Sequence, residues 1–266
     1  ISPMQTALIS GASSGIGEAL AGYFARGGYN LVLVARSEDK LKQLARKLKG
    51  DHGVRVTVEP ADLSRRGAAR KLAGKLINQS IEVDVLVNNA GVLEHGNFVD
   101  IAAAAHQRLI DLNISGLTGM LKAFLPAMVQ RGSGRVLNVA SIASFQPVPS
   151  LASYAASKAY VLSLTESLSE ELTGSGVTVT ALCPGLTATN MVSTVQQKSD
   201  GLNKIPEFLI GDVDDVAAQG YRACLKGDVI CVPGAVNLAA TLAGRSVPKW
   251  LLRRVSGIMG RYTTRG

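Results

Sequence analysis

Aromatic residues are scarce in this sequence, at 5% of 266 residues, and no dense run of lysine and arginine is interleaved with them. Proteins that bind single-stranded nucleic acid stack bases on aromatic side chains beside a basic groove. The formal charge of +8 is equally suited to a phosphorylated ligand or an anionic membrane surface. The absence of an aromatic and basic footprint therefore argues against a nucleic-acid partner.

Potential metal ligands and disulfide partners are also few. The three cysteines are Cys183, Cys224 and Cys231. Their odd number and the lack of a CxxC spacing suggest neither a disulfide framework nor a zinc site and favour reduced thiols. The three histidines, His52, His95 and His106, show no ligand spacing, so they are interpreted as surface or loop residues and no metal is predicted.

The sequence shows neither a charged and apolar leader at its start nor an apolar run near the roughly twenty residues that span a bilayer. A cytoplasmic location is therefore expected. Residues 1–3 precede Met4 and are interpreted as an expression remnant. Hydrophobic residues reach 47% against 18% charged residues, which suits one large domain over residues 1–266.

Short runs rich in Val, Leu and Ile alternate with longer segments of helical period, which predicts βαβ units and a doubly wound parallel α/β sheet with helices on both faces. The seven expected strands are residues 7–10, 30–35, 54–60, 83–88, 134–140, 177–183 and 229–232. The expected helices include residues 17–27, 38–48, 64–78, 103–130 and 154–173, with Ser64 as the N-cap of the third.

A glycine-rich loop, GASSGIG, joins the first strand to the first helix. Gly11 allows a tight turn, Gly15 lets the backbone approach a pyrophosphate, and Gly17 allows close packing of the helix. Free N–H groups at the helix start favour phosphate. The GxxxGxG spacing differs from the GxGxxG of the common dinucleotide fingerprint, and the loop lacks the Lys-Ser/Thr ending of a P-loop, so an ATPase is disfavoured. The place of the loop between a strand and a helix favours a Rossmann-type dinucleotide site.

The second strand ends without the acidic residue that would hold the ribose hydroxyls of NAD(H). Arg36 stands there instead, followed by Ser37. A guanidinium group and a hydroxyl suit a 2′-phosphate, so NADP(H) is predicted as the cofactor. The alternative is that Arg36 is only a solvated charge at the strand end.

Tyr154 and Lys158 lie four residues apart in a predicted helix, and therefore on one face. An ammonium group near a phenol favours the phenolate, so Lys158 is expected to lower the pKa of Tyr154 toward a useful range. Such a pair can act as a general acid and base.

Several motifs follow one another in an order that resembles the short-chain dehydrogenase/reductase family, from about Gln5 to at least Val232. They are the loop Gly11 to Gly17, Asp62 and Leu63, the run Asn88, Asn89, Ala90 and Gly91, then Asn113, Ser141, Tyr154 with Lys158, and Pro184 with Gly185. One departure is small, because Ser10 keeps the hydroxyl of the threonine that commonly opens the glycine motif.

The resemblance implies a role for each catalytic residue. Tyr154 would exchange a proton with the substrate oxygen, and Ser141 would hydrogen-bond the same oxygen. Lys158 would lower the tyrosine pKa and hold the nicotinamide ribose, while Asn113 would position a water in a proton relay. Simpler structural roles remain open, since Ser141 and Asp62 could cap turns and Asn113 could bond the helix backbone.

The resemblance also implies the NADP(H) contacts. They would come from Gly11, Ser13, Ser14, Gly15, Ile16, Gly17, Arg36, Ser37, Asp62, Leu63, Asn89, Ala90, Gly91, Tyr154, Lys158, Pro184, Gly185, Thr187 and Thr189. Of these, Asp62 would meet the adenine, Asn89 to Gly91 the adenosine ribose, and the segment from Pro184 to Thr189 the nicotinamide.

Two regions do not fit the alternation of strands and helices. Residues 187–211 are expected to form the substrate loop, and their apolar side chains favour a hydrophobic carbonyl compound. These side chains are Met191, Val192, Val195, Leu202, Ile205, Phe208 and Leu209. Residues 235–266 are basic and amphipathic, which favours a subunit interface over a membrane surface. The family resemblance implies homodimers or homotetramers.

Two other functions are compatible with parts of this sequence. One is a catalytically silent NADP(H) sensor on the same fold, which would be expected to lack Tyr154, Lys158 or Ser141. The other is an extended epimerase, which needs a larger C-terminal substrate domain than this chain has after Val232. The complete motif set favours an oxidoreductase that interconverts a carbonyl and an alcohol.

Overall fold

The computed structural model describes residues 4–187, 211–234 and 237, and these form a seven-stranded sheet in which every neighbouring pair is parallel. The strand order is β3-β2-β1-β4-β5-β6-β7. The strands are β1 (Thr6–Ser10), β2 (Asn30–Ala35), β3 (Val56–Pro60), β4 (Val85–Asn88), β5 (Gly134–Val139), β6 (Val177–Leu182) and β7 (Ile230–Cys231). The predicted parallel α/β fold is confirmed.

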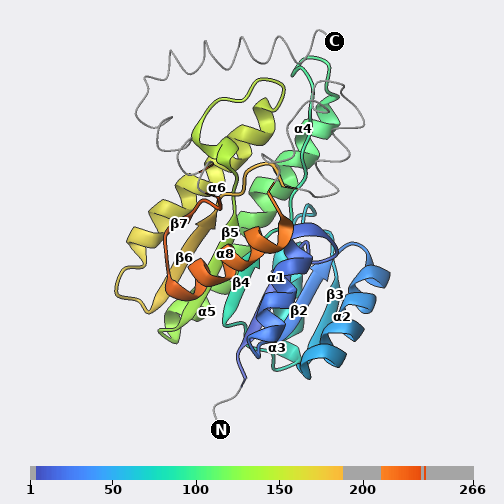
Figure 1. Cartoon of the computed structure of the whole chain (residues 1–266), viewed down its shortest axis with the longest axis vertical. Helices are drawn as coiled ribbons and strands as arrows, with labels where there is room; N and C mark the ends of the chain where they lie inside the picture. The colour runs from blue at the N-terminus through green and yellow to red at the C-terminus, as the bar shows by residue number, and fades with distance from the viewer. Residues whose placement is uncertain (1–3, 188–210, 235–236, 238–266) are drawn as a thin grey trace.

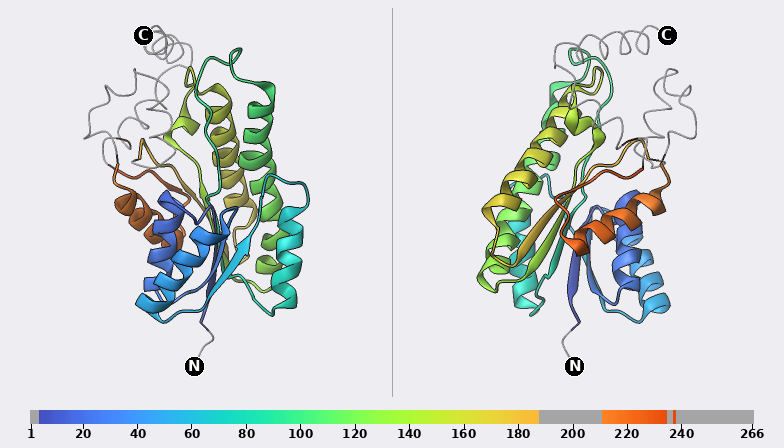
Figure 2. Two further views of the ribbon diagram at one scale, coloured as in Figure 1. Left: turned by 90° about the vertical axis from the view of Figure 1, so that its right-hand side faces the viewer. Right: turned by 60° about the vertical axis from the view of Figure 1, so that its left-hand side comes forward.

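Helices cover both faces of the sheet, as the two views in Figure 2 show. One face carries α1 (Gly15–Arg26), α2 (Glu38–His52) and α8 (Val213–Lys226). The other carries α3 (Ala68–Asn78), α4 (Ala103–Ile110), the π-helical segment η1 (Asp111–Gly116), α5 (Leu117–Gln130) and α6 (Ala152–Glu171). A short 3₁₀ helix, η2 (Ile142–Phe145), precedes α6 (Figure 1).

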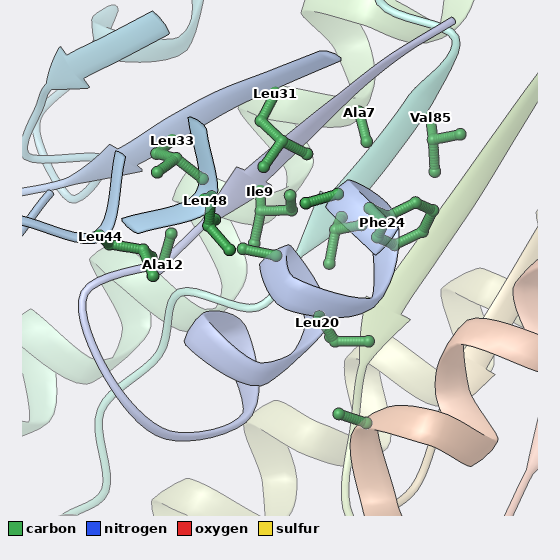
Figure 3. Close-up of a cluster of buried hydrophobic side chains, with 14 of the residues drawn as sticks. Ala7, Ile9, Ala12, Leu20, Phe24, Leu31, Leu33, Leu44, Leu48 and Val85 are labelled. Carbon is green, nitrogen blue, oxygen red and sulfur yellow. The ribbon is translucent and has the colours of Figure 1, made fainter. Parts of the chain in front are cut away.

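The core is split by the sheet into two hydrophobic clusters. The central strands are buried on both sides, which explains why their sequences are continuously apolar rather than alternating. Figure 3 shows part of one cluster, with Ile9 of β1, Leu33 of β2, Leu20 and Phe24 of α1, and Leu44 and Leu48 of α2 labelled. Each such side chain contributes about 1.5–3 kcal/mol through burial.

The predicted helix over residues 64–78 begins later, and Ser64 does not cap it. The structure starts α3 at Ala68, after Gly67 with φ +80°. The backbone N–H and the hydroxyl of Ser64 instead donate to Asp62 Oδ1 at 3.1 and 2.6 Å. This local side-chain turn competes with the helix, so the first residues after β3 stay outside it.

The predicted helix over residues 103–130 is continuous but irregular. Six residues, Asp111–Gly116, form the π-helical segment between α4 and α5. This 28-residue helix is long and apolar enough for a membrane span by length and composition, and 39% of the apolar window is buried in the protein. Its buried side chains, including Met120 and Phe124, pack onto the sheet, which accounts for its apolar character.

Helix α8 was not among the helices expected from the sequence, although its ends carry ordinary signals. Asp212 accepts hydrogen bonds from the backbone N–H groups of Asp214 and Asp215, and Gly227 ends the helix at φ +79°. The expectations for residues 1–3, 188–210 and 238–266 lie outside the described residues.

Candidate active site

The carboxyl ends of the parallel strands bring the sequence-predicted residues to one edge of the sheet. β1 leads into Gly11, β4 into Asn89, β5 into Ser141 and β6 into Pro184. The strands that follow β1 are added on one side of it as far as β3, and from β4 onward they are added on its other side. Ligands of doubly wound sheets bind outside such a switch point, here between β1 and β4. Two groups of residues result, one around the glycine loop and one around Tyr154.

The glycines of the loop are required by its backbone conformation or by close contacts. Gly11 and Gly15 have φ values of +66° and +58°, which favour glycine. A Cβ on Gly17 would lie 2.4 Å from both the Gly11 carbonyl oxygen and Asn89 Nδ2. Ser14, the N-cap residue of α1, has an extended conformation and makes no side-chain cap, and an uncapped helix start of this kind favours an anion.

Polar side chains brace this loop from β4. Ser10 Oγ donates to the Val87 carbonyl at 3.2 Å and accepts from the backbone N–H groups of Asn89 and Ala90 at 3.0 and 3.1 Å. Asn89 Nδ2 donates to the carbonyls of Ser10 and Gly11 at 3.1 and 3.2 Å. The Asn89 side chain therefore holds the glycine loop through hydrogen bonds. The sequence motif alone did not predict this contact.

The second strand ends at an exposed cation. Arg36 is exposed after β2, and Ser37 precedes α2 without a side-chain cap. Asp62 follows the neighbouring strand β3, and its hydrogen bond from Ser64 is the largest cause that lowers the pKa of its carboxyl group. Arg36 and Arg65 also lower that pKa, so both cations lie within electrostatic reach of Asp62. The structure thus brings Arg36, Ser37 and Asp62 together at one edge.

Ser141, Tyr154 and Lys158 form the second group. Ser141 lies two residues after β5 and is the N-cap of η2, where its Oγ accepts from Ala143 N at 3.1 Å. The same side chain hydrogen-bonds Tyr154 on the first turn of α6. Lys158 is only 6% exposed and donates to the Val139 carbonyl at 2.8 Å. Its Nζ lies 5.7 Å from the Tyr154 ring centroid.

The pKa of Tyr154 moves opposite to the sequence-based expectation. Burial raises it, and the hydrogen bond with Ser141 lowers it by less. Burial also lowers the pKa of Lys158 to about 8, partly opposed by the nearby Cys183. Both shifts have the same physical cause, because a low-dielectric surrounding disfavours the charged form of each group.

Asn113 lies in the π-helical segment and joins this group from the side. Its Nδ2 donates to the Val92 carbonyl at 2.9 Å and to Ser157 Oγ at 3.1 Å, while its Oδ1 accepts from Val92 N at 2.9 Å. A Cβ on Gly91 would lie 3.3 Å from Asn113 Oδ1 and 3.5 Å from Lys158 Nζ. Gly91 therefore lets the strand end approach both side chains.

The segment after β6 closes the group. The Pro184 carbonyl accepts from Ile142 N at 2.9 Å, which ties this segment to η2. A Cβ on Gly185 would lie 2.5 Å from Asn237 Nδ2, and the buried Thr187 hydroxyl donates to the Gly185 carbonyl at 3.0 Å. Thr189 lies outside the described residues. Among the residues that are described, no three His, Cys, Asp or Glu side chains gather as metal ligands.

Among known protein families, the model described as short chain dehydrogenase matches residues 5–200. Oxidoreductase UcpA from Salmonella typhimurium is 39% identical over 197 residues, which make up 74% of this chain and 74% of that protein.

Similar solved structures cover more of this chain than the sequence relative does. A short-chain dehydrogenase from Sphingobium yanoikuyae, solved in complex with NADPH, has a TM-score of 0.80 and 33% identity, covering 92% of this chain and 96% of that one. A bulky-bulky ketone specific alcohol dehydrogenase from Comamonas testosteroni has a TM-score of 0.76 and 30% identity, covering 92% and 96%.

Proposed function

This chain belongs to the short-chain dehydrogenase family, and on that premise we propose that it is an NADP(H)-dependent oxidoreductase that interconverts a carbonyl compound and an alcohol. The observation that carries the proposal is the group of Tyr154, Ser141 and Lys158 at the carboxyl edge of the sheet. A phenol with a hydrogen-bonded hydroxyl and a nearby ammonium is suited to exchange a proton with a substrate oxygen.

The residues around the glycine loop fit a dinucleotide. Side chains on Gly11 and Gly17 would collide with Asn89 and displace the loop, and the uncapped start of α1 favours a pyrophosphate. Arg36 at the end of β2 favours a 2′-phosphate, and no acidic residue stands there to favour NAD(H). The NADPH complex of the Sphingobium relative is consistent with this choice. Asp62 and Leu63 would line the adenine, and Asn89 to Gly91 the adenosine ribose.

When bound, NADP(H) supplies or accepts the hydride. Tyr154, whose pKa is raised by burial, is protonated at neutral pH and donates its proton to the carbonyl oxygen during reduction. Ser141 hydrogen-bonds the same oxygen and stabilises the charge that develops on it. In oxidation Tyr154 takes the proton back from the alcohol.

Lys158 and Asn113 complete the proposed proton path. The pKa of Lys158 near 8 leaves it largely charged at neutral pH and able to exchange protons there. Its Nζ would hold the nicotinamide ribose while Asn113 positions a water beside it. The segment from Pro184 to Thr189 would orient the nicotinamide.

A hydrophobic substrate and assembly into a homodimer or homotetramer belong to the same proposal. The apolar side chains expected in residues 187–211 support the first, as does the ketone specificity that describes the Comamonas relative. The silent-sensor alternative is disfavoured because Tyr154, Lys158 and Ser141 are all present.

The test is the oxidation of NADPH with a panel of aldehydes and ketones of graded chain length, repeated with NADH. Tyr154→Phe should lower turnover by about 100-fold or more while NADPH binding changes little. Tyr160→Phe is the matched control, because Tyr160 lies on the same helix and its hydroxyl contacts Thr118 instead. Full turnover by Tyr154→Phe would exclude the proposed acid, and NADPH binding without any turnover would favour the sensor.

A further inference from the structure

The helix that carries Tyr154 begins without a cap of its own. Leu151 is its N-cap residue and makes no side-chain hydrogen bond. The preceding Ser150 has φ +66°, a left-handed conformation that costs a non-glycine residue about 1–2 kcal/mol. Contacts from elsewhere in the chain must therefore hold this first turn in place.

Those contacts come from the β4–α4 connection, defined here as residues 89–102, and from α4. The Gly96 backbone N–H donates to the Ser150 carbonyl at 2.9 Å. Ser153 Oγ lies 2.8 Å from His106 Nδ1. Figure 2 shows α4 and α6 on the same side of the sheet, where the two helices pack together. The hydrogen bond from Gly96 reaches Ser150, which precedes the N-cap residue Leu151, and the contact with His106 reaches Ser153, the neighbour of Tyr154.

The donor and the acceptor of the hydrogen bond between Ser153 and His106 can be assigned. His106 Nε2 lies 3.1 Å from the Phe98 carbonyl oxygen, which can only accept a hydrogen bond. In the neutral ring Nε2 therefore carries the proton, and Nδ1 accepts from the Ser153 hydroxyl. The Phe98 ring stacks on the imidazole at a centroid distance of 4.4 Å and an interplanar angle of 28°. Both nitrogens and one ring face of His106 are thus engaged.

We propose that His106 is a positioning residue that links the β4–α4 connection to the catalytic helix through Ser153 and so sets the position of Tyr154. This inference rests on the proposed function of Tyr154. His106 was predicted from the sequence as a surface or loop residue, and the structure places it half-buried in α4. A displacement of Tyr154 by a fraction of an ångström is expected to slow proton transfer more than it weakens the binding of NADPH.

The first experiment compares His106→Ala with Gln107→Ala. Gln107 is the next residue of α4, and its side chain bonds only Asp111 among the contacts described for it. With a carbonyl substrate from the panel, His106→Ala should lower kcat by about tenfold or more while KM and the Kd for NADPH stay within about threefold. Gln107→Ala should leave all three near the parent values.

A double-mutant cycle and a rescue identify the contact. Ser153→Ala should lower kcat as much as His106→Ala does, and the double variant should lower it no further, because both remove one interaction. His106→Asn should recover part of the lost kcat, since an amide oxygen can accept from Ser153. A residue that matters only for stability would instead change the melting temperature without this pattern.

Hydrogen exchange gives a readout that needs no substrate. In His106→Ala the amides of residues 151–158 should exchange about tenfold faster, whereas Gln107→Ala should leave them unchanged. Unchanged exchange and unchanged kcat in His106→Ala would overturn the positioning role, as would additive effects of His106→Ala and Ser153→Ala. If the parent itself turned over no carbonyl, the proposed function would fail while the exchange result still decided whether His106 holds the helix.

Discussion

Lys158 is buried where an ammonium group is costly, because 6% of the residue reaches solvent and its pKa falls from 10.5 to about 8. A shift of this size corresponds to about 3 kcal/mol of lost stability at neutral pH. The hydrogen bond to the Val139 carbonyl recovers about 1 kcal/mol. We infer that Lys158 is kept for the reaction rather than for the fold.

Replacing this lysine should therefore stabilise the protein. Lys158→Met should raise the free energy of unfolding at pH 7 by about 2 kcal/mol and abolish turnover. Between pH 8 and 10.5 the unfolded chain binds more protons than the folded one, so the free energy of unfolding of the parent rises with pH. The difference in free energy of unfolding between Lys158→Met and the parent should therefore become smaller as the pH rises. Urea unfolding at several pH values measures this, with Lys122→Met on α5 as the exposed control. A destabilised Lys158→Met would contradict the cost of burial.

Single residues show where prediction from sequence reaches its limit. The spacing of Tyr154 and Lys158 predicted their proximity, and the ring and ammonium do lie 5.7 Å apart. It did not predict that burial would raise the tyrosine pKa, because desolvation depends on the side chains that surround the pair in three dimensions. The contact of His106 with Ser153 joins residues 47 positions apart and leaves no local pattern.

At the scale of elements, the start of α1 depends on the absence of a side chain at Gly17. Gly17→Ala should weaken the binding of NADPH by about tenfold or more, because its Cβ would meet the Gly11 carbonyl at 2.4 Å and displace the loop. Gly22→Ala on the same helix has nothing within 4 Å of the added carbon and should stabilise the helix by about 0.5–1 kcal/mol.

Calorimetric titration with NADPH and thermal unfolding measure the two effects. Equal affinity of Gly17→Ala and the parent would show that the loop does not need this close approach. A loss of affinity in Gly22→Ala would show instead that any added carbon on α1 disturbs the site.

Strands were easier to predict than helix ends. Buried parallel strands leave continuous apolar runs, so β2 was predicted with its observed bounds, Asn30–Ala35. The beginning of α3 was misplaced because Ser64 bonds Asp62 instead of the helix. The π-helical segment within residues 103–130 was not foreseen, since an insertion in the hydrogen-bond ladder does not change the apolar character of the sequence.

The whole molecule confirms the family resemblance that the ordered motifs indicated. A parallel sheet with helices on both faces gathers residues from β1, β4, β5 and β6 at one edge, and Figure 1 labels β4, β5 and β6 side by side in this sheet. The order of the motifs along the chain is sufficient to predict this gathering, because every strand points the same way. The proposed site is therefore a consequence of topology as much as of the residues themselves.

The most direct test of the proposed reaction follows the hydride. NADPH that carries deuterium in place of both hydrogens at C4 of the nicotinamide is incubated with the parent, Tyr154→Phe or Tyr160→Phe and a ketone that the panel identifies, and the alcohol is analysed by mass spectrometry. The parent and Tyr160→Phe should form alcohol that carries deuterium on the former carbonyl carbon, and Tyr154→Phe should form almost none. Alcohol without deuterium, or equal formation by Tyr154→Phe, would contradict the account.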